Sequence, residues 1–219
     1  RGGSTFRFAN LDELTTFAGF VSETLRPERG SFIDLGGQWS GASHTLQVTA
    51  YDLKMKDEIA FSLLTFENEN LAKTRHRGIE ANGSVDVNRF WKLSGGVNLQ
   101  SATFREGSDR GNDIPLVPRV QANAGVHILP SAEWDIALLA QHIGRRYFGG
   151  DTGNVRPRLP AYSIADLVVT WQHARWTARG RVLNLADKRY APTGYDFGFG
   201  SSYYPADGRS FFADLRYSF

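Results

Sequence analysis

Apolar and polar residues alternate along segments of about ten residues, and this alternation constrains the fold more than any other feature of the chain. From Trp176 to Val182, Trp, Ala, Gly and Val take one parity, while Arg179 and Arg181 lie on the other. The longest apolar runs, such as Ile136 to Ala140, fall far short of the roughly 20 residues that a transmembrane helix requires. A period of two is that of a β-strand, so the chain is predicted to be all-β.

The apolar parity is rich in alanine and glycine. Val120, Ala122 and Ala124, for example, alternate with Gln121 and Asn123. The core of a β-sandwich favours bulky branched side chains that interlock, whereas lipid accepts small ones. We therefore predict a membrane-spanning antiparallel up-and-down β-barrel whose apolar face contacts lipid and whose polar face lines a wide lumen.

These segments are separated by a short turn and a longer polar loop alternately, which predicts a series of hairpins. About nine strands are expected, many near the 9 to 11 residues of a tilted transmembrane strand. The predicted strands are Ser31–Ser40, His44 to about Phe66, Thr74–Val87, Phe90–Phe104, Pro118–Leu129, Glu133–Arg146, Ala161–Trp171, Arg175–Leu185 and Arg209–Phe219. Residues 1–30 are expected to form an extracellular loop and a partial strand, and residues 31–219 the barrel strands.

The five tryptophans all carry the apolar parity, and each lies beside a short turn rather than a long loop. Indole rings prefer the membrane–water interface, and short turns mark the periplasmic side of such barrels. The residues predicted to form a belt at that interface are Trp39, Trp91, Trp134, Trp171 and Trp176.

Composition and motifs exclude several other classes of protein. The net charge of +2 comes from 25 basic and 23 acidic residues scattered along the chain, unlike a nucleic-acid-binding face. The chain has no cysteine, hence no disulfide or thiolate site. The five histidines lie in different predicted strands or turns without metal-ligand spacing, and no Gly-x-Ser-x-Gly motif is present. We therefore predict no catalytic residue and no metal held by the protein.

Two features bear on processing and on calcium. Segments 109–113 and 150–154 contain Asp and Asn that could supply calcium ligands, but these are also the default residues of turns, which is the favoured interpretation. No signal peptide is present, although an exported barrel needs one, so residue 1 is expected to lie within a longer precursor.

The end of the chain has a terminal aromatic residue preceded by alternating apolar residues, which resembles the assembly signal of outer-membrane barrels. The residues of this signal are Phe211, Leu215, Tyr217 and Phe219. Together with NLADKRY at 184–190 and YYPADGRSF at 203–211, this strand closely resembles the last two strands of the TonB-dependent receptors. LRPE at 25–28, RGIE at 77–80 and IPLVPR at 114–119 resemble recurrent barrel segments of the same family.

The resemblance implies a bacterial outer-membrane protein in which a barrel of about 22 strands surrounds an N-terminal plug domain. This chain would supply the C-terminal strands, since no plug, TonB box or earlier strand is found in it. The implied function is energised uptake of a metal chelate, foremost a ferric siderophore, with no enzymatic activity and no covalently bound cofactor. The implied partners are the remaining barrel and plug, the TonB-type inner-membrane complex, the barrel assembly machinery and outer-membrane lipid or lipopolysaccharide, without nucleic acid.

Ligand capture is expected in the long loops Glu106–Pro115, Gly149–Pro160 and Ala191–Asp207, predicted to lie together on the extracellular side. Arginine and aromatic rings suit flat anionic metal chelates, although interface anchoring or loop packing explains the same residues. The candidate ligand-binding residues are Arg105, Arg110, Arg145, Arg146, Tyr195, Phe197, Phe199, Tyr203 and Tyr204.

Several functions stay open on the sequence alone. Receptors for siderophores, haem, cobalamin and copper chelates share this barrel pattern. A passive porin or adhesion barrel is one alternative, and it should lack a plug. A soluble β-domain that binds carbohydrate or lipid is another, and it should not need detergent for extraction.

Overall fold

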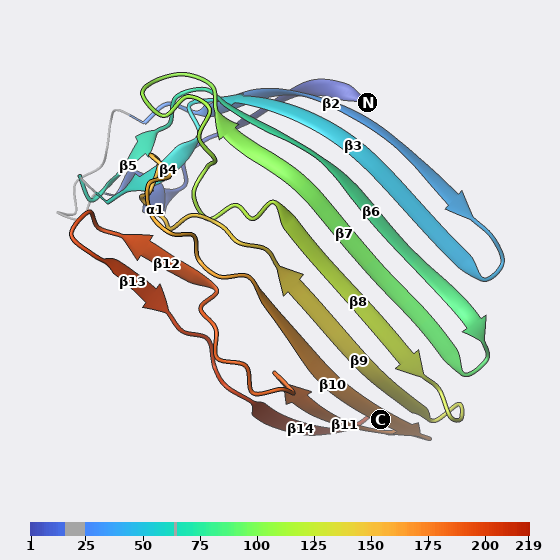
Figure 1. Cartoon of the computed structure of the whole chain (residues 1–219). Helices are drawn as coiled ribbons and strands as arrows, with labels where there is room; N and C mark the ends of the chain where they lie inside the picture. The colour runs from blue at the N-terminus through green and yellow to red at the C-terminus, as the bar shows by residue number, and fades with distance from the viewer. Residues whose placement is uncertain (16–24, 64) are drawn as a thin grey trace.

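The computed structural model describes residues 1–15, 25–63 and 65–219, which form one strongly curved β-sheet with loops and small hairpins gathered at one end (Figure 1). Ten strands follow one another in the order β1-β2-β3-β6-β7-β8-β9-β10-β11-β14, and neighbours are antiparallel. Their bounds are Gly2–Arg7, Glu28–Ser40, His44–Lys56, Thr74–Asn88, Trp91–Phe104, Val120–Ile128, Trp134–Ile143, Tyr162–His173, Trp176–Leu183 and Ser210–Tyr217.

Three small elements lie outside the large sheet. The hairpins are β4 (Ile59–Ser62) with β5 (Glu67–Asn70), and β12 (Thr193–Asp196) with β13 (Ser201–Tyr204). The helix α1 spans Leu11–Leu14. Among the described residues, no helix has the length and apolar character needed to cross a membrane.

The sheet contains the predicted strands and adds β1 at its first edge. The sequence of β1, GGSTFR, shows no clear alternation, so its pairing with β2 was not predicted. Arg7 ties this edge in place, because its guanidinium lies 2.6 Å from a carboxylate oxygen of Glu28 and 2.7 Å from one of Glu13. The extension of the second predicted strand to about Phe66 is wrong. β3 ends at Lys56 because Asp57 takes a φ of 59°, which leaves the extended region, and the chain then forms the β4–β5 hairpin.

The register of the sheet puts the apolar parity of every long strand on the same face. One row across this face reads Leu46, Gly83, Gly95, Ala124, Ala140 and Ala165. The row beside it, on the opposite face, reads Gln47, Asn82, Gly96, Asn123 and Gln141. The sheet therefore has two faces of opposite chemistry along its whole width.

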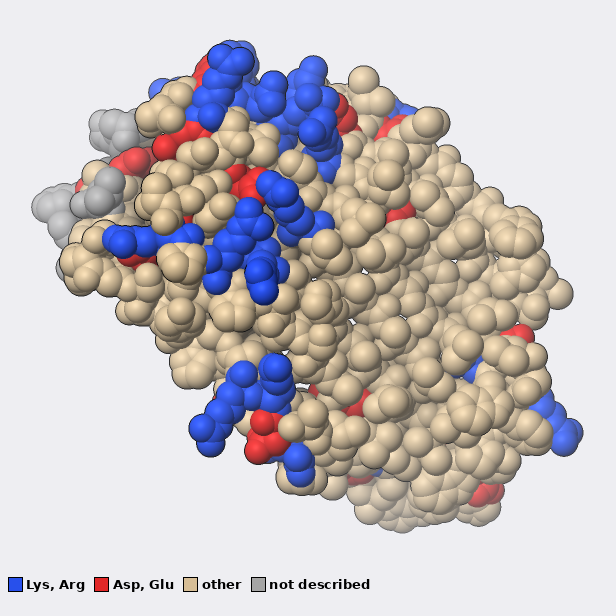
Figure 2. Space-filling model, viewed as in Figure 1, with Lys and Arg blue, Asp and Glu red and all other residues tan. Residues whose placement is uncertain are grey.

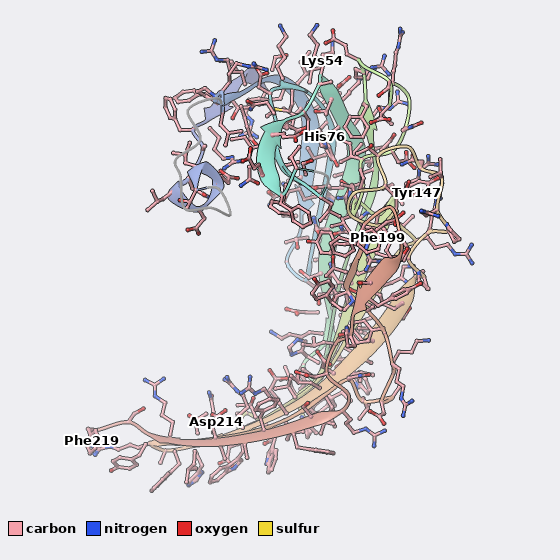
Figure 3. The ribbon with its side chains drawn as sticks, turned by 90° about the vertical axis from the view of Figure 1, so that its left-hand side faces the viewer. Lys54, His76, Tyr147, Phe199, Asp214 and Phe219 are labelled. Atoms are coloured by element: carbon pink, nitrogen blue, oxygen red, sulfur yellow. The ribbon has the colours of Figure 1, made fainter. Side chains whose placement is uncertain are left out.

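The apolar face is convex and the polar face concave. Figure 2 looks onto the convex face, where lysine and arginine gather near the loop end and a broad area toward the short turns carries few charges. Asp214 lies on the concave side in Figure 3. Large apolar side chains remain exposed on the convex face: Ile33 is 70% exposed, Leu35 78% and Leu215 66%. A face of this extent and chemistry suits lipid rather than water.

All five tryptophans lie at the strand ends that adjoin the short turns. Trp134 and Trp171 stand directly opposite each other on β9 and β10, and Trp176 opens β11 after the turn. Trp39 lies near the end of β2, and Trp91 opens β7. The structure thus brings them to one rim on the apolar face, and their contact with a bilayer interface stays a prediction.

A glycine on the concave face makes room for a tyrosine from the neighbouring strand. Gly78 is the direct partner of Tyr51, and a Cβ built at Gly78 would lie 2.7 Å from the Tyr51 hydroxyl. The same hydroxyl donates a hydrogen bond of 3.3 Å to Gln100 on β7. Tyr51 therefore reaches across β6 to β7, which is possible because residue 78 has no side chain.

The long loops pack against one another at the rim opposite the tryptophans. Asn154 accepts a 2.7 Å hydrogen bond from the backbone N–H of Asp113 and donates one of 2.9 Å to its carbonyl. Gly149 donates to the carbonyl of Gly194 at 2.9 Å and accepts from the N–H of Asp196 at 2.8 Å. The loops after β7, β9 and β11 are therefore cross-linked, and the segments predicted to lie together do so.

A buried arginine anchors the last of these loops. Arg146 is only 4% exposed and donates to the carbonyls of Gly144, Ala191 and Pro192, while its guanidinium lies 5.4 Å from the ring centre of Tyr162. Burial lowers the pKa of this guanidinium below its ordinary value. Carbonyl oxygens and an aromatic face, rather than a carboxylate, compensate its lost hydration.

The two faces can be tested with one pair of neighbouring residues in the barrel of the full-length protein. Val97→Arg would place a charge on the convex face and is expected to cost roughly 2 to 4 kcal/mol if that face meets the bilayer midplane. Asn98→Arg, on the concave face opposite Glu80 and Gln121, should be much milder. Heat-modifiable migration on gels measures the folded fraction, and equal loss in both variants would contradict the assigned faces.

The anchoring role of Arg146 predicts a local effect. Arg146→Met keeps the volume but leaves the carbonyls of Ala191 and Pro192 without their donor, at a cost of about 1.5 to 3 kcal/mol for charge-assisted hydrogen bonds. Hydrogen exchange of the Asp196 amide should then speed up at least about tenfold. Arg145→Met, at the exposed neighbour, should leave exchange unchanged. Equal rates in the two variants would show that Arg146 does not hold this loop.

Candidate ligand-binding site

A cavity of about 680 Å³ lies among the loops at the loop end of the sheet, and we call it the loop cavity. Four segments far apart in sequence line it: the β4–β5 hairpin and the loops after β7, β9 and β11. Its apolar lining consists of Ala60, Phe61, Leu63, Leu71, Ala72, Phe104, Ile114, Pro115, Leu116, Val155, Tyr195 and Phe197. Its charged lining consists of Glu69, Glu106, Asp109, Asp151, Arg156 and Asp196.

Hydrogen bonds of Asp151 and the glycine at position 150, both in the loop after β9, bring the walls of the loop cavity together. Asp151, 4% exposed, accepts hydrogen bonds of 2.9 Å from the N–H of Val155 and 3.0 Å from that of Arg156. Gly150 takes a φ of +87°, and a Cβ there would lie 2.6 Å from Leu63 and 2.8 Å from the carbonyl of Asp196. Residue 150 therefore lets the β4–β5 and β12–β13 hairpins approach the same point of the loop.

An ion pair closes one side of the loop cavity. The Nε of Arg156 lies 2.5 Å from a carboxylate oxygen of Asp196, and the Asp196 side chain is only 7% exposed. Arg156 also donates to the carbonyl of Gly198 at 3.0 Å. Asp196 thus neutralises Arg156, the one Lys or Arg side chain in the described lining of the loop cavity. The remaining carboxylates of the lining give the loop cavity a net negative charge.

A second contact fixes the β4–β5 hairpin above the concave face. His76, which points to the concave side of β6 in Figure 3, has its Nε2 3.0 Å from a carboxylate oxygen of Glu58, just before β4. The backbone N–H of Leu71 donates to the carbonyl of Glu58 at 2.7 Å and completes the base of the hairpin. The loop cavity is therefore held next to the mouth of the concave side.

The predicted aromatic ligand residues divide into three groups. Tyr195 and Phe197 line the loop cavity. Tyr204 and Tyr203 are outside the lining and remain more than half exposed. Tyr204 packs edge-on against Tyr195 with ring centres 5.6 Å apart, and Tyr203 packs edge-on against Phe148 at 5.2 Å. Phe199 is 92% exposed at the tip of the β12–β13 hairpin.

The predicted arginines are not found in the lining. Arg105, Arg110 and Arg145 are exposed elsewhere, and Arg146 is buried as a loop anchor. Sequence reasoning instead missed Arg156, although it lies in a predicted loop, because its partner Asp196 is 40 residues away. The roles of all these residues in binding stay predictions.

The Asp and Asn residues considered for calcium act in turns and between loops. Asp113 pairs with Arg119 at 2.9 Å, both carboxylate oxygens of Asp151 accept backbone N–H groups, and Asn154 joins two loops. No group of three or more His, Cys, Asp or Glu suited to a metal ion occurs among residues 1–15, 25–63 and 65–219. The lining suits reversible binding of a molecule with apolar or aromatic surface.

Similarity to known proteins extends over most of the chain. The pesticin receptors of Yersinia enterocolitica and Yersinia pestis are 26% identical to it over 186 residues, which is 81% of this chain and 27% of theirs. The chain therefore spans about a quarter of the length of these curated relatives.

Two solved structures have the same arrangement of strands. The ferric yersiniabactin uptake receptor FyuA of Yersinia pestis matches with a TM-score of 0.75 and 25% identity, over 88% of this chain and 30% of that one. The copper transporter OprC matches with a TM-score of 0.78 and 22% identity, over 100% of this chain and 36% of that one, and shows the fold.

The family model described as "TonB dependent receptor-like, beta-barrel" matches residues 2–185, from β1 to just beyond β11. The convex apolar face, the concave polar face and the sequential antiparallel strands agree with this match. The chain belongs to the TonB-dependent receptors of the bacterial outer membrane, and its strands are part of their β-barrel.

Proposed function

We propose that this chain forms the C-terminal wall of a receptor that imports a metal chelate, foremost a ferric siderophore, across the outer membrane with energy from a TonB-type complex. The observation that carries the proposal is the convergence of four loops around one aromatic-lined cavity at the mouth of the concave face. The names of the relatives support it, since FyuA is a ferric yersiniabactin uptake receptor.

The sheet needs other strands to function in a membrane. In the described part of the chain, β1 and β14 each have a neighbour on one side only, so their outer edges present unpaired N–H and C=O groups. Such groups cost several kcal/mol each in hydrocarbon, which requires further strands to close the barrel. A barrel of this family is wide enough to hold a plug domain against the concave polar face.

Each part then has one task in transport. The loops bind the chelate from outside, the concave face forms part of the lumen wall, and the convex face anchors the barrel in lipid. A pull on the plug by the TonB-type complex opens the lumen, and no covalent step is required of this chain. The outward residues Phe211, Leu215, Tyr217 and Phe219 on and after β14 serve as the signal read by the barrel assembly machinery.

The lining of the loop cavity narrows the chemistry of the chelate. Arg156 is already neutralised by Asp196 and Glu106 pairs with Lys73, while Glu69, Asp109 and Asp151 add negative charge. This wall disfavours a highly anionic chelate and favours one with aromatic or aliphatic surface and little net negative charge.

The loop cavity can be tested in the full-length receptor with four variants. Phe197→Ala and Tyr195→Ala should weaken ferric-siderophore binding about tenfold or more, because burial of an aromatic side chain contributes roughly 1.5 to 3 kcal/mol. Arg156→Ala should also change affinity, whereas Arg158→Ala should not. Arg158 has the same charge on the same loop, but it stacks on Tyr147 instead of lining the cavity. Fluorescence quenching with a panel of ferric siderophores measures affinity, and unchanged binding in all three cavity variants would remove the cavity from the site.

The sidedness of the loops gives a separate prediction. A cysteine at Gly200, which has open space around it, should react on intact cells with a membrane-impermeant maleimide. A cysteine at Ala174, in the short turn between β10 and β11, should react only after the outer membrane is permeabilised. The reverse labelling pattern would overturn the orientation, and with it the binding role of the loops.

Deletion of Gly194 to Ser202 extends the test from single side chains to the whole hairpin. Removal of this segment should weaken chelate binding and leave the folded barrel intact, because a surface loop shortens at little cost in closure entropy. Gel migration and quenching together measure both effects.

A further inference from the structure

Charged side chains hold the base of the β4–β5 hairpin to the rest of the chain. Arg26 lies 2.6 Å from a carboxylate oxygen of Asp57, just before β4. The carboxylate of Glu28, which pairs with Arg7, accepts a 2.8 Å hydrogen bond from the backbone N–H of Ile59. Guanidinium groups stay protonated and carboxylates stay ionised from about pH 5 to about pH 8. These contacts are therefore the same throughout that range.

A further contact at this base is made by a histidine. Nε2 of His76, which lies between the strands and the hairpin in Figure 3, is 3.0 Å from one carboxylate oxygen of Glu58 and 3.2 Å from the other. An ionised carboxylate only accepts hydrogen bonds, so Nε2 carries a proton and is the donor. Among the described residues, no hydrogen bond involves the other ring nitrogen, Nδ1. Nδ1 is therefore the nitrogen that gains or loses a proton, which histidine does between about pH 5 and about pH 8.

Glu58 is the carboxylate that contacts His76 in the described part of the chain. One of its oxygens also accepts a hydrogen bond from the hydroxyl of Thr74, which is 2% exposed. The residues directly opposite His76 in the sheet, Leu53 and Ala102, are apolar. The side chains of His76 and Glu58 are 22% and 21% exposed, so water screens their interaction only in part. A change in the charge of His76 therefore acts first on Glu58.

The other titratable or charged groups around His76 are paired, neutral or further away. They are Asp57 before β4, Glu28 on β2, Tyr51 on β3, Glu69 on β5 and Glu80 on β6. Asp57 and Glu28 pair with arginines, and Glu69 accepts a 2.6 Å hydrogen bond from the hydroxyl of Thr65. Tyrosine is uncharged below about pH 8, and Glu80, four residues from His76, lies about 13 Å along the strand. Arg75 and Arg77, on either side of His76, take the opposite face of β6.

The β4–β5 hairpin is one wall of the loop cavity, and Glu58 directly precedes it. Phe61 and Leu63 line the cavity from this hairpin. A Cβ built at Gly150 would lie 2.6 Å from Leu63, so the hairpin closely approaches the loop after β9. The carbonyl of Glu58 accepts the N–H of Leu71 at 2.7 Å, which ties both ends of the hairpin to the same residue. A weaker hold on Glu58 therefore lets the whole wall move away from that loop.

We propose that His76 is a positioning residue whose protonation, acting through Glu58, tightens the loop cavity and strengthens chelate binding. The proposal rests on the function proposed above for the loop cavity. The protonated ring adds the attraction of opposite charges to a hydrogen bond that the neutral ring also donates. Loss of the proton therefore weakens the contact between His76 and Glu58 without removing it. Chelate binding is accordingly strongest in acidic medium and declines as the pH rises through the range in which histidine titrates.

The position of the hairpin can be measured without a ligand, in the full-length receptor in detergent. Nitroxide labels at Glu67 on the hairpin and at Ser43 in the turn between β2 and β3 would report their separation by pulsed electron paramagnetic resonance. In wild type, the distance distribution should be narrow at about pH 5.5 and broader at about pH 8. His76→Gln keeps an N–H donor that does not titrate, so its distribution should be the same at both pH values.

His127 provides a matched control at the other end of the sheet. It forms the same kind of pair with Asp135, with 2.9 Å between Nδ1 and a carboxylate oxygen, on β8 close to the short turns. His127→Gln should therefore retain the change of distance distribution with pH that wild type shows. A wild-type distribution that does not change with pH would overturn the proposal, and so would a change that persists in His76→Gln or disappears in His127→Gln.

Chelate binding on the same samples tests the consequence for the loop cavity. The probes are ferrichrome and ferrioxamine B, two ferric hydroxamates that keep their charge over this range of pH. Fluorescence quenching should show binding to wild type about fivefold weaker at about pH 8 than at about pH 5.5, the size expected for a partly exposed ion pair. The affinities at the two pH values should agree in His76→Gln and should differ in His127→Gln as they do in wild type.

The outcomes separate this proposal from the uptake function. Equal affinities of wild type at both pH values would contradict the role of His76 in binding, as would a pH dependence in His76→Gln equal to that of wild type. Failure of both probes to bind wild type, with the changes in distance intact, would count against the uptake function and for the positioning of the hairpin by His76.

Discussion

The structure depends on the requirement that backbone polar groups be paired with one another wherever the sheet lies in hydrocarbon. Only continuous strand-to-strand hydrogen bonding meets this requirement without helices, and it fixes the antiparallel order from β1 to β14. Side chains then have to alternate between two environments. A shift of one residue in the register of a strand would turn its whole apolar set toward the lumen, for example Leu46 on β3 or Leu99 on β7. The apolar pattern therefore also specifies the pairing.

The same requirement explains why the functional groups lie at the ends of the strands. Within the membrane span, the convex positions are reserved for apolar or small residues and the concave positions for the lumen wall. Variable chemistry is left to the rims, where tryptophans adjoin the short turns and the loops form a packed layer. Arg146 and the Asn154–Asp113 contacts hold this layer in shape around the loop cavity. Walls that are held by such contacts need less ordering when a molecule binds between them.

Sequence reasoning was accurate where the environment acts on every second residue. β8 and β11 were predicted within a few residues of their ends, because lipid on one side and lumen on the other select each position. It failed where local geometry decides. The strand that begins at His44 was predicted to run to about Phe66, but the left-handed conformation of Asp57 ends β3 at Lys56. It also failed to identify β1, whose pairing depends on β2 and on Arg7 rather than on its own pattern.

The candidate site was predictable only in part, for a related reason. Tyr195 and Phe197 could be assigned to a ligand-binding loop by residue type, whereas Arg156 and Asp196 acquire their arrangement from loops that meet only in the folded protein. The arginines favoured by residue type were drawn into other roles, such as the buried anchor at Arg146. Side-chain type therefore indicates the rim at which the loop cavity lies, and tertiary contacts select the residues that line it.

A nitroxide scan along β8 tests most directly whether the convex face contacts lipid, with the full-length receptor reconstituted in bilayers and power saturation measured with oxygen and with a water-soluble nickel chelate. A barrel wall with its convex face in lipid should give accessibilities with a period of two from Val120 to Ile128. Labels at Ala122, Ala124 and Val126 should be relaxed by oxygen and shielded from nickel, and labels at Gln121, Asn123 and Gly125 should be less accessible to oxygen. Accessibility that does not alternate, or that alternates with the polar positions facing oxygen, would contradict a barrel wall with its convex face in lipid.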